Sequence, residues 1–218
     1  MKRMIFNSTI IAAGLMTVIN FCSCNLKKSP TTINPQAEKI TVLPVNNIPD
    51  DFIMGVDVSS LVSVEAGRAK FYDANGMASD PIALLKAGGA NAVRIRVWNN
   101  PNTNDGRTYG GGANDIEVAC NLGKRATSLG MKVLIDFHYS DFWADPNKQT
   151  APKGWEKFSL EEKQKAIAEY TTGSLAKLKK AGVKVSMVQV GNEINNGLCG
   201  EIYDAEVCSL VKAGRSEE

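Results

Sequence analysis

Histidine is almost missing from this sequence, since only His138 occurs among its 218 residues. A single imidazole excludes the His-rich sites that commonly hold catalytic zinc, and the spacing of the five cysteines matches no zinc motif. We therefore expect neither a metal ion nor another cofactor. Cys120 is expected to be a buried free thiol, whereas Cys199 and Cys208 flank a loop and either pair or stay reduced.

An excess of charge of one sign is also missing. The sequence has 25 basic and 23 acidic residues, a net charge of +2, and no long run of like charges. This balance gives no reason to expect a nucleic-acid partner, and we expect none. The content of 44% hydrophobic and 22% charged residues is ordinary for a folded domain in water.

The sequence contains no apolar run long enough to cross a bilayer. Its clearest apolar stretch, residues 10–19, follows a basic start and leads to two cysteines. This order is typical of a bacterial lipoprotein signal, in which a small residue precedes the lipidated cysteine. Ser23 precedes Cys24, whereas the bulky Phe21 precedes Cys22, so Cys24 is the expected lipidation site. A plain secretory signal with incidental cysteines is the alternative.

Both alternatives place the protein outside the cytoplasm, and the lipoprotein signal predicts an anchor in a membrane facing the periplasm or the cell surface. We expect residues 1–24 to be the signal peptide. Residues 25–50 are rich in Lys, Ser, Thr, Pro and Asn and lack apolar periodicity, which indicates a flexible tether. Residues 51–218 are then expected to form the folded domain.

From residue 52 onward, strand-like and helix-like segments alternate. Short β-branched and apolar runs predict four strands, at residues 52–57, 92–98, 132–138 and 185–193. Capping residues, helical spacing of apolar residues and terminal glycines predict four helices, at residues 81–88, 115–129, 160–181 and 204–213. Such alternation is typical of an α/β domain with a parallel sheet covered by helices.

Two features favour a (β/α)8 barrel, the TIM barrel, over a doubly wound sheet. No Gly-x-Gly-x-x-Gly turn follows the first strand, and the long polar insertions follow strands rather than helices. A whole barrel needs about 250 residues, more than the expected domain contains. We therefore expect the first four β-α units of a barrel. The open edges of such a sheet favour aggregation or self-association.

Polar side chains gather where the predicted strands end. The strands carry Asp57, then Arg94, Arg96 and Trp98, then Asp136 and His138, and finally Asn192 and Glu193. The loops that follow add Tyr139, Asp141, Trp143, Asp145 and Trp155. The carboxyl ends of barrel strands form the active site. Carboxylates and amides bind sugar hydroxyls and indole rings stack on sugar faces, so this set predicts a carbohydrate site.

Several of these residues also have a purely structural interpretation. Arg94 and Asp57 either bind substrate or only pair with each other inside the barrel mouth. His138 either lines a cleft or orients a loop, and Trp98 either stacks on a sugar or fills the core. Trp143 lies in a polar loop, which favours stacking on a sugar. A carboxylate such as Glu193 at a strand end is a candidate general acid if burial raises its pKa.

Four segments together resemble glycoside hydrolase family 53, the arabinogalactan endo-β-1,4-galactanases. They are Gly55-Val-Asp-Val-Ser-Ser60, Val93-Arg-Ile-Arg-Val-Trp98, Asp136-Phe-His-Tyr-Ser-Asp141 with Trp143-Ala-Asp-Pro146, and Gly191-Asn-Glu-Ile-Asn-Asn196. The third is specific, whereas Gly-Asn-Glu also occurs in related barrel glycosidases. The resemblance extends from about residue 52 to the C-terminus and implies retaining endo-hydrolysis of β-1,4-galactan, the side chain of pectin.

The resemblance also implies roles for individual residues. Glu193 would be the general acid/base, Asn192 would hold the sugar 2-hydroxyl, and Arg94 would lie near the nucleophile. Asp57 occupies a position where the family uses a carboxylate for support and binding. The substrate cleft would be lined by Trp98, His138, Asp141 and Trp143.

The catalytic nucleophile is where this sequence departs from the family. Retaining glycosidases need a second carboxylate about 5–5.5 Å from the first, and the family takes it from a seventh strand. The four predicted units do not include that strand, so we assign no nucleophile and expect a truncated chain. Two other functions stay open: a non-catalytic surface lipoprotein that binds glycans, and a related barrel glycosidase that acts on another β-1,4-glycan.

Overall fold

The computed structural model describes residue 43 and residues 45–215. The predicted signal segment, with Cys24, and most of the predicted tether lie outside the described residues. The chain from Ile48 onward forms one unit. Within the described part of the chain, no helix combines the length and the apolar character needed to cross a membrane.

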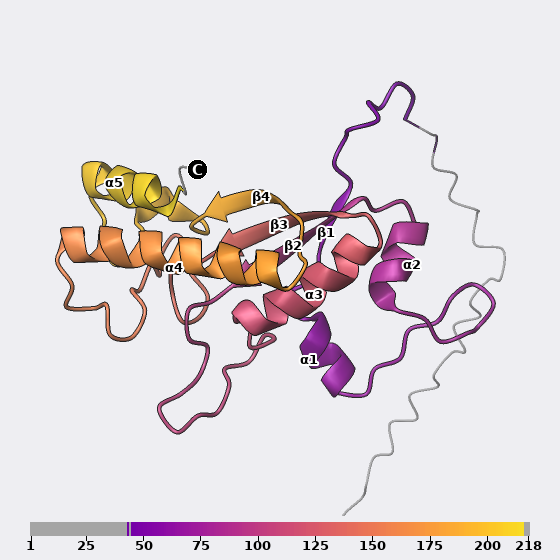
Figure 1. The fold of residues 1–218 in the computed structure, drawn as a ribbon, viewed down its shortest axis with the longest axis horizontal. Coiled ribbons are helices and arrows are strands. Elements are labelled where there is room, and N and C mark those ends of the chain that lie inside the picture. The colour runs from indigo at the N-terminus through magenta and orange to yellow at the C-terminus, as the bar shows by residue number, and fades with distance from the viewer. Residues whose placement is uncertain (1–42, 44, 216–218) are drawn as a thin grey trace, which may run out of the picture. The chain divides into compact units, whose positions relative to one another are not determined.

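Four parallel strands form a single sheet in the order β1-β2-β3-β4 (Figure 1). The strands are β1 (Gly55–Asp57), β2 (Ala92–Val97), β3 (Lys132–Phe137) and β4 (Val185–Val190). Their register pairs Asp57 with Arg94, and it aligns Arg96, Asp136 and Gln189 in one row across the sheet. Sequential parallel strands joined by helices are the arrangement of consecutive units in a (β/α)8 barrel. The predicted alternation is therefore confirmed.

Helices α1 to α4 lie in the connections between strands and α5 follows β4, and several of them begin at predicted caps. The helices are α1 (Leu61–Ala66), α2 (Pro81–Ala87), α3 (Ile116–Ser128), α4 (Leu160–Lys180) and α5 (Asp204–Gly214), with a 3-10 turn η1 (Ile194–Asn196). The Asp80 side chain accepts a hydrogen bond from the Ile82 N–H at 2.7 Å. Ser159 and Glu162 form a complete capping box at the start of α4. The short helix α1 was not predicted, and its first turn has no side-chain cap.

The hydrophobic core lies between the sheet and its helices (Figure 1). Alternate strand residues with no exposed surface face this core: Ile95, Val97, Val133, Ile135 and Phe137. Leu122 of α3 and Ile167 of α4 belong to the same buried cluster. Because strand side chains alternate between faces, the intervening positions carry Arg94, Arg96 and Asp136 to the opposite face. The sheet thus has the apolar core on one face and these charged side chains on the other, which is called the charged face below.

Strands β2 and β3 each end one residue earlier than predicted, and two other predicted limits are wrong by three residues. Strand β1 begins at Gly55 rather than at residue 52, because pairing with β2 starts at Gly55 and the apolar side chains of residues 52–54 are exposed. Strand β4 ends at Val190, so Asn192 and Glu193 lie in the turn that follows it. Both residues nevertheless lie just beyond the carboxyl end of the strand.

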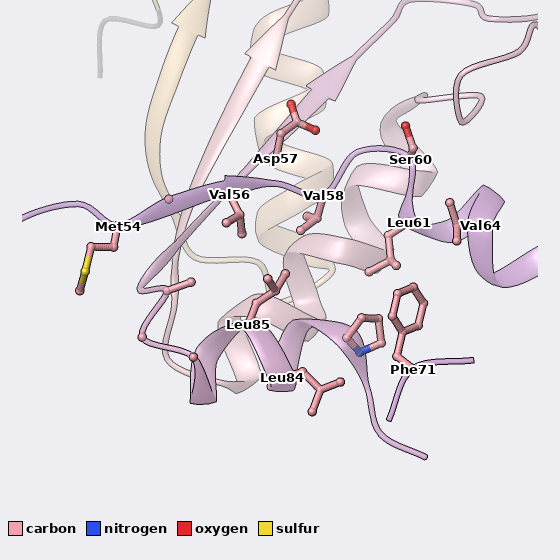
Figure 2. A pocket seen from close by; sticks show the side chains of 15 residues that line it. Met54, Val56, Asp57, Val58, Ser60, Leu61, Val64, Phe71, Leu84 and Leu85 are labelled. Atoms are coloured by element: carbon pink, nitrogen blue, oxygen red, sulfur yellow. The ribbon is translucent and has the colours of Figure 1, made fainter. Parts of the chain in front are cut away.

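Two grooves lie along the edges of the sheet, one lined mainly by apolar side chains and the other by a mixture of apolar and polar ones. One, of about 730 Å³, lies beside β1 and is lined by Val56, Leu61, Phe71, Leu84 and Leu85 among others (Figure 2). The other, of about 720 Å³, lies beside β4 along α4. Within the described residues, neither β1 nor β4 pairs with a strand on its outer side. Both grooves therefore follow the open edges, and the groove beside β1 reaches the polar cluster at the strand ends, because Asp57 and Ser60 also line it.

Candidate active site

Arg94 connects the ends of three chain segments on the charged face. Its Nη1 donates to Asp57 Oδ2 at 2.8 Å, and its Nη2 donates to Asp136 Oδ2 and, at 2.9 Å, to Asn192 Oδ1. Asp136 is fully buried, whereas Arg94 keeps 32% of its side chain exposed. A buried carboxylate is stable only when its charge is paired, so Arg94 balances Asp136. Arg94 also pairs with Asp57, as one of the two interpretations of the sequence expected.

Asp57 is held in its ionised form by its neighbours. Burial by itself raises the pKa of this carboxyl, but hydrogen bonds from Ser59 and the positive charges of Arg96 and Arg94 outweigh that effect. The pKa of Asp57 is therefore lower than its ordinary value. Its Oδ1 accepts from the Ser59 N–H at 2.9 Å, and its Oδ2 accepts from Arg94. Both oxygens are thus engaged with protein donors.

His138 and Trp98 lie beneath the surface of the site with no exposed area. His138 Nδ1 accepts hydrogen bonds from Trp98 Nε1 and from the Ala144 N–H, each at 3.2 Å. An acceptor nitrogen carries no hydrogen, so the neutral ring has its hydrogen on Nε2, which lies 3.2 Å from Asp136 Oδ2. His138 thus orients the loop at Ala144 and Trp98 fills the interior. Their direct contact with a sugar stays a prediction.

Asp141 is also mostly buried, with 8% of its surface exposed. Its two oxygens accept from backbone N–H groups, one from Asn100 at 2.9 Å and one from Lys153 at 2.8 Å. Asp141 therefore ties the loops after β2 and β3 together. Its predicted place in the lining of a substrate cleft remains a prediction.

Trp143 presents an exposed aromatic surface at this end of the sheet, with 38% of its area accessible. The guanidinium carbon of Arg96 lies 4.3 Å from the centre of its ring. Trp98 approaches it edge-on, with ring centres 5.7 Å apart. The glycine-rich loop passes close by, because a Cβ at Gly111 would lie 3.6 Å from Trp143 Nε1. These neighbours thus hold the indole of Trp143 in place, while part of its surface stays accessible.

Two of the loop aromatics are placed elsewhere. Tyr139 is fully buried and its hydroxyl shares a hydrogen bond with Thr171 at 2.8 Å, so its expected place among the sugar-binding groups is wrong. Trp155 packs against Tyr170, which itself contacts Tyr139. Both aromatic residues serve the packing of α4 rather than the surface at the strand ends.

Asn192 and Glu193 complete the cluster. Asn192 is 5% exposed, and besides accepting from Arg94 it donates through Nδ2 to the Ala144 carbonyl at 2.8 Å. Because Ala144 follows Trp143, this hydrogen bond holds the segment that carries the exposed indole beside the turn after β4. Glu193 is exposed and adopts a left-handed backbone conformation, with φ 50° and ψ 46°. The arrangement offers an exposed carboxylate next to a fixed amide and an aromatic surface.

Two features of the site could not be assigned from the sequence: the contact that Arg96 makes and the presence of Gln149. Arg96 shares a face with Arg94 by strand alternation, but only the three-dimensional structure shows that it supports Trp143. Gln149 lies in a polar loop with no local signal, yet its side-chain amide contacts the backbone of Asn192 and Glu193. Such a contact joins segments more than 40 residues apart, which local pattern does not reveal.

Comparison with known proteins identifies close relatives. A family model described as glycosyl hydrolase family 53 matches residues 53–216. An endo-beta-1,4-galactanase of Bacillus subtilis (strain 168) is 49% identical over 179 residues, which cover 82% of this chain and 42% of the relative. A probable arabinogalactan endo-beta-1,4-galactanase A of Neosartorya fischeri is 39% identical over 66% of this chain and 38% of its own length.

Solved structures agree with the sequence relatives. A GH53 catalytic domain of Ignisphaera aggregans superposes with a TM-score of 0.77 at 40% identity, covering 80% of this chain and 50% of that domain. One of two fungal beta-1,4-galactanases superposes with a TM-score of 0.66 at 36% identity, over 73% and 47% of the respective chains. These matches confirm the predicted fold class. The chain spans less than half the length of the curated relatives named above.

Proposed function

Because this chain belongs to glycosyl hydrolase family 53, we propose that it supplies the acid/base side of an active site that cleaves β-1,4-galactan with retention of configuration. The observation that carries the proposal is Glu193, an exposed carboxylate just beyond the end of β4 whose neighbour Asn192 is fixed by Arg94. In this role Glu193 protonates the glycosidic oxygen as the bond breaks and then deprotonates the attacking water.

The remaining site residues have consistent roles in binding galactan. One N–H of Asn192 is used by the Ala144 carbonyl, which leaves the other to donate to a sugar hydroxyl. The exposed indole of Trp143 offers a flat apolar surface for a galactose ring. Arg94 and Arg96 together balance the charges of Asp57 and Asp136, so this cluster has little net charge. A neutral, hydroxyl-rich polymer suits such a surface.

No nucleophile is proposed among the described residues. Asp136 is buried against Arg94, Asp57 is engaged by Arg94 and Ser59, and Asp141 accepts from two backbone N–H groups. None of these carboxylates is free to attack a sugar carbon. The second candidate function is that the chain binds glycans at the cell surface without cleaving them.

Hydrolysis and binding are tested together on purified protein. Reducing-sugar release measures cleavage of β-1,4-galactan, and titration calorimetry with β-1,4-galactan, mannan and xylan oligosaccharides measures binding. If the wild-type protein cleaves galactan, Glu193→Gln should lower its rate by roughly 10²–10⁴-fold and leave binding largely intact. Glu161→Gln, at the exposed start of α4, is the matched control.

The outcomes separate the candidates. Binding of galactan without sugar release supports the glycan-binding function. Tighter binding of mannan or xylan than of galactan contradicts the proposed substrate. On aryl galactosides with a good leaving group, the glycosylation step needs less protonation, so Glu193→Gln should slow it less than it slows galactan cleavage. Equal losses on both substrates would argue against Glu193 as the acid.

The proposal extends to the location of the protein, which is export followed by anchoring through a lipid on Cys24. Its support is the apolar stretch at residues 10–19 that leads to Ser23 and Cys24. A diacylated cysteine anchors stably because two acyl chains enter the bilayer. Cys24→Ala should move the protein from the membrane fraction to the soluble fraction. Release by Cys22→Ala instead would assign the lipid to the other cysteine.

A further inference from the structure

The loop between β3 and α4 folds back over the turn that follows β4, and Gln149 is its point of contact. The backbone carbonyl of Gln149 accepts a hydrogen bond from the Gly200 N–H at 2.5 Å. A Cβ at Gly197 would lie 3.6 Å from the Gln149 Cβ, so the two backbones approach closely. The side chain of Gln149 is thereby held against the turn that carries Asn192 and Glu193.

The amide nitrogen of Gln149 lies among backbone carbonyl oxygens. Its Nε2 donates to the carbonyls of Asn192 at 2.8 Å, Asp145 at 3.1 Å and Glu193 at 3.2 Å. Three acceptors around one end of the amide require that end to be the nitrogen, since an oxygen there would be repelled. The Oε1 atom is buried and accepts no hydrogen bond from the described residues. Gln149 thus acts here as a donor.

Two of these carbonyls flank the Cα of Glu193. The carbonyl of Asn192 belongs to the peptide plane before Glu193, whose orientation sets φ, and the Glu193 carbonyl belongs to the plane after it, whose orientation sets ψ. A single side chain therefore restrains both backbone dihedral angles of Glu193. Those angles are left-handed, with φ 50° and ψ 46°, a conformation that costs a residue with a Cβ roughly 1–2 kcal/mol. Such a conformation persists where the surroundings fix it.

We propose that Gln149 is a positioning residue that holds Glu193 in its left-handed conformation and so aims its carboxyl group at the glycosidic oxygen. This inference rests on the proposed function of Glu193 as the acid/base. Asn192 is held independently by Arg94 and the Ala144 carbonyl. Loss of the Gln149 amide should therefore loosen Glu193 more than it disturbs Asn192.

The first test measures order at Glu193 and needs no substrate. Gln149→Met keeps the length of the side chain and removes its donors, and Gln164→Met, on α4, is the matched control. Backbone ¹⁵N relaxation should give Glu193 an order parameter near 0.85 in the wild type and in the control. In Gln149→Met it should fall below about 0.6, the range of a flexible segment. An unchanged order parameter at Glu193 would overturn the proposal.

A second variant tests the hydrogen bond within one folded protein. Gln149→Glu has the same shape but donates only when its carboxyl is protonated, and burial among carbonyl oxygens raises the pKa of that carboxyl above its ordinary value of about 4.3. Order at Glu193 should increase on acidification of this variant, relative to the wild type at each pH. A response identical to that of the wild type would contradict a role for the donor.

Kinetics connect the positioning to the chemistry. In wild-type protein that cleaves galactan, Gln149→Met should lower kcat by roughly 10–100-fold with little change in KM, because a displacement of about 1 Å costs that much. The loss should be smaller on aryl galactosides, which depend less on the acid. A general structural defect would lower both rates equally and overturn the proposal. If the wild type neither binds nor cleaves galactan, the proposed function fails, while the order parameters still decide whether Gln149 holds Glu193.

Discussion

The guanidinium group of Arg96 lies against the indole of Trp143, 4.3 Å from guanidinium carbon to ring centre. Arg96 is itself restrained, because its Nη2 donates to Ser60 Oγ at 3.0 Å and its Nη1 lies 3.6 Å from Asp57 Oδ1. The flat, charged group therefore packs against the aromatic ring, while 38% of the surface of Trp143 remains accessible. Arginine suits this position because its planar group both stacks and pairs with carboxylates.

Arg96→Lys should weaken the binding of β-1,4-galactan oligosaccharides while leaving the charge near Asp57 in place. A cation–π contact contributes about 0.5–2 kcal/mol, so loss of the contact between Arg96 and Trp143 would lower the affinity for the oligosaccharide roughly 2- to 30-fold. Titration calorimetry measures the change. Arg107→Lys is the control, since Arg107 is 81% exposed and pairs only with Asp105 among the described residues. Equal losses in the two variants would argue against a specific role for Arg96.

The lowered pKa of Asp57 predicts how stability depends on pH. A carboxyl whose pKa is lower in the folded state than its ordinary 3.8 contributes stability above that value. The contribution is lost as the pH falls from about 4 through the folded-state pKa. In Asp57→Asn this contribution is missing, so denaturant unfolding at a series of pH values should show a shallower decline below pH 4. A decline as steep as in the wild type would contradict the ion pairs of Asp57.

The cysteines should differ in reactivity because they differ in burial. Cys199 is buried, and this desolvation raises the pKa of its thiol to about 12. Cys208 is exposed, and both are free thiols in the structure. Iodoacetamide at pH 8 should therefore modify Cys208 at least tenfold faster than Cys199, as peptide mass spectrometry can measure. A disulfide between the two in the purified protein would contradict the free thiols.

When residues 1–218 are expressed by themselves, the uncovered edges of the sheet predict self-association. Val188 lies on β4 with 38% of its surface exposed and lines the groove beside that strand. Charged residues on edge strands oppose pairing with another chain. Val188→Lys should therefore shift the protein toward monomer in size-exclusion chromatography at a fixed concentration, relative to the wild type. Met77→Lys changes an exposed apolar residue in a loop and is the control. A monomeric wild type would refute this prediction.

Local signals predicted most of the fold. Asp80, Asp115 and Ser159 each accept a hydrogen bond from the first turn of a helix, and their positions set the predicted starts within one or two residues. The short helix α1 was not predicted, because its six residues show little periodicity and its first turn has no side-chain cap. Residues 52–54 are apolar but unpaired, so composition predicted a strand where no partner exists among the described residues.

The site was predicted in part. Strand alternation placed Arg94 and Asp136 on one face, and the structure joins them in an ion pair. Burial depends on how loops fold over the strand ends, so the sequence did not reveal that Trp98 and His138 lie beneath the surface. The contact of Gln149 with Glu193 arises from the same folding of loops and has no signature in local spacing.

The left-handed backbone of Glu193 bears on how this position responds to selection. Glycine adopts such angles without steric penalty and asparagine tolerates them, so either residue would relieve the backbone strain at this position. Variants selected only for heat resistance should therefore accumulate Gly or Asn at this position, whereas variants selected for galactan breakdown should keep Glu. At position 193, in the turn after β4, selection for thermal stability and selection for galactan breakdown thus favour different amino acids.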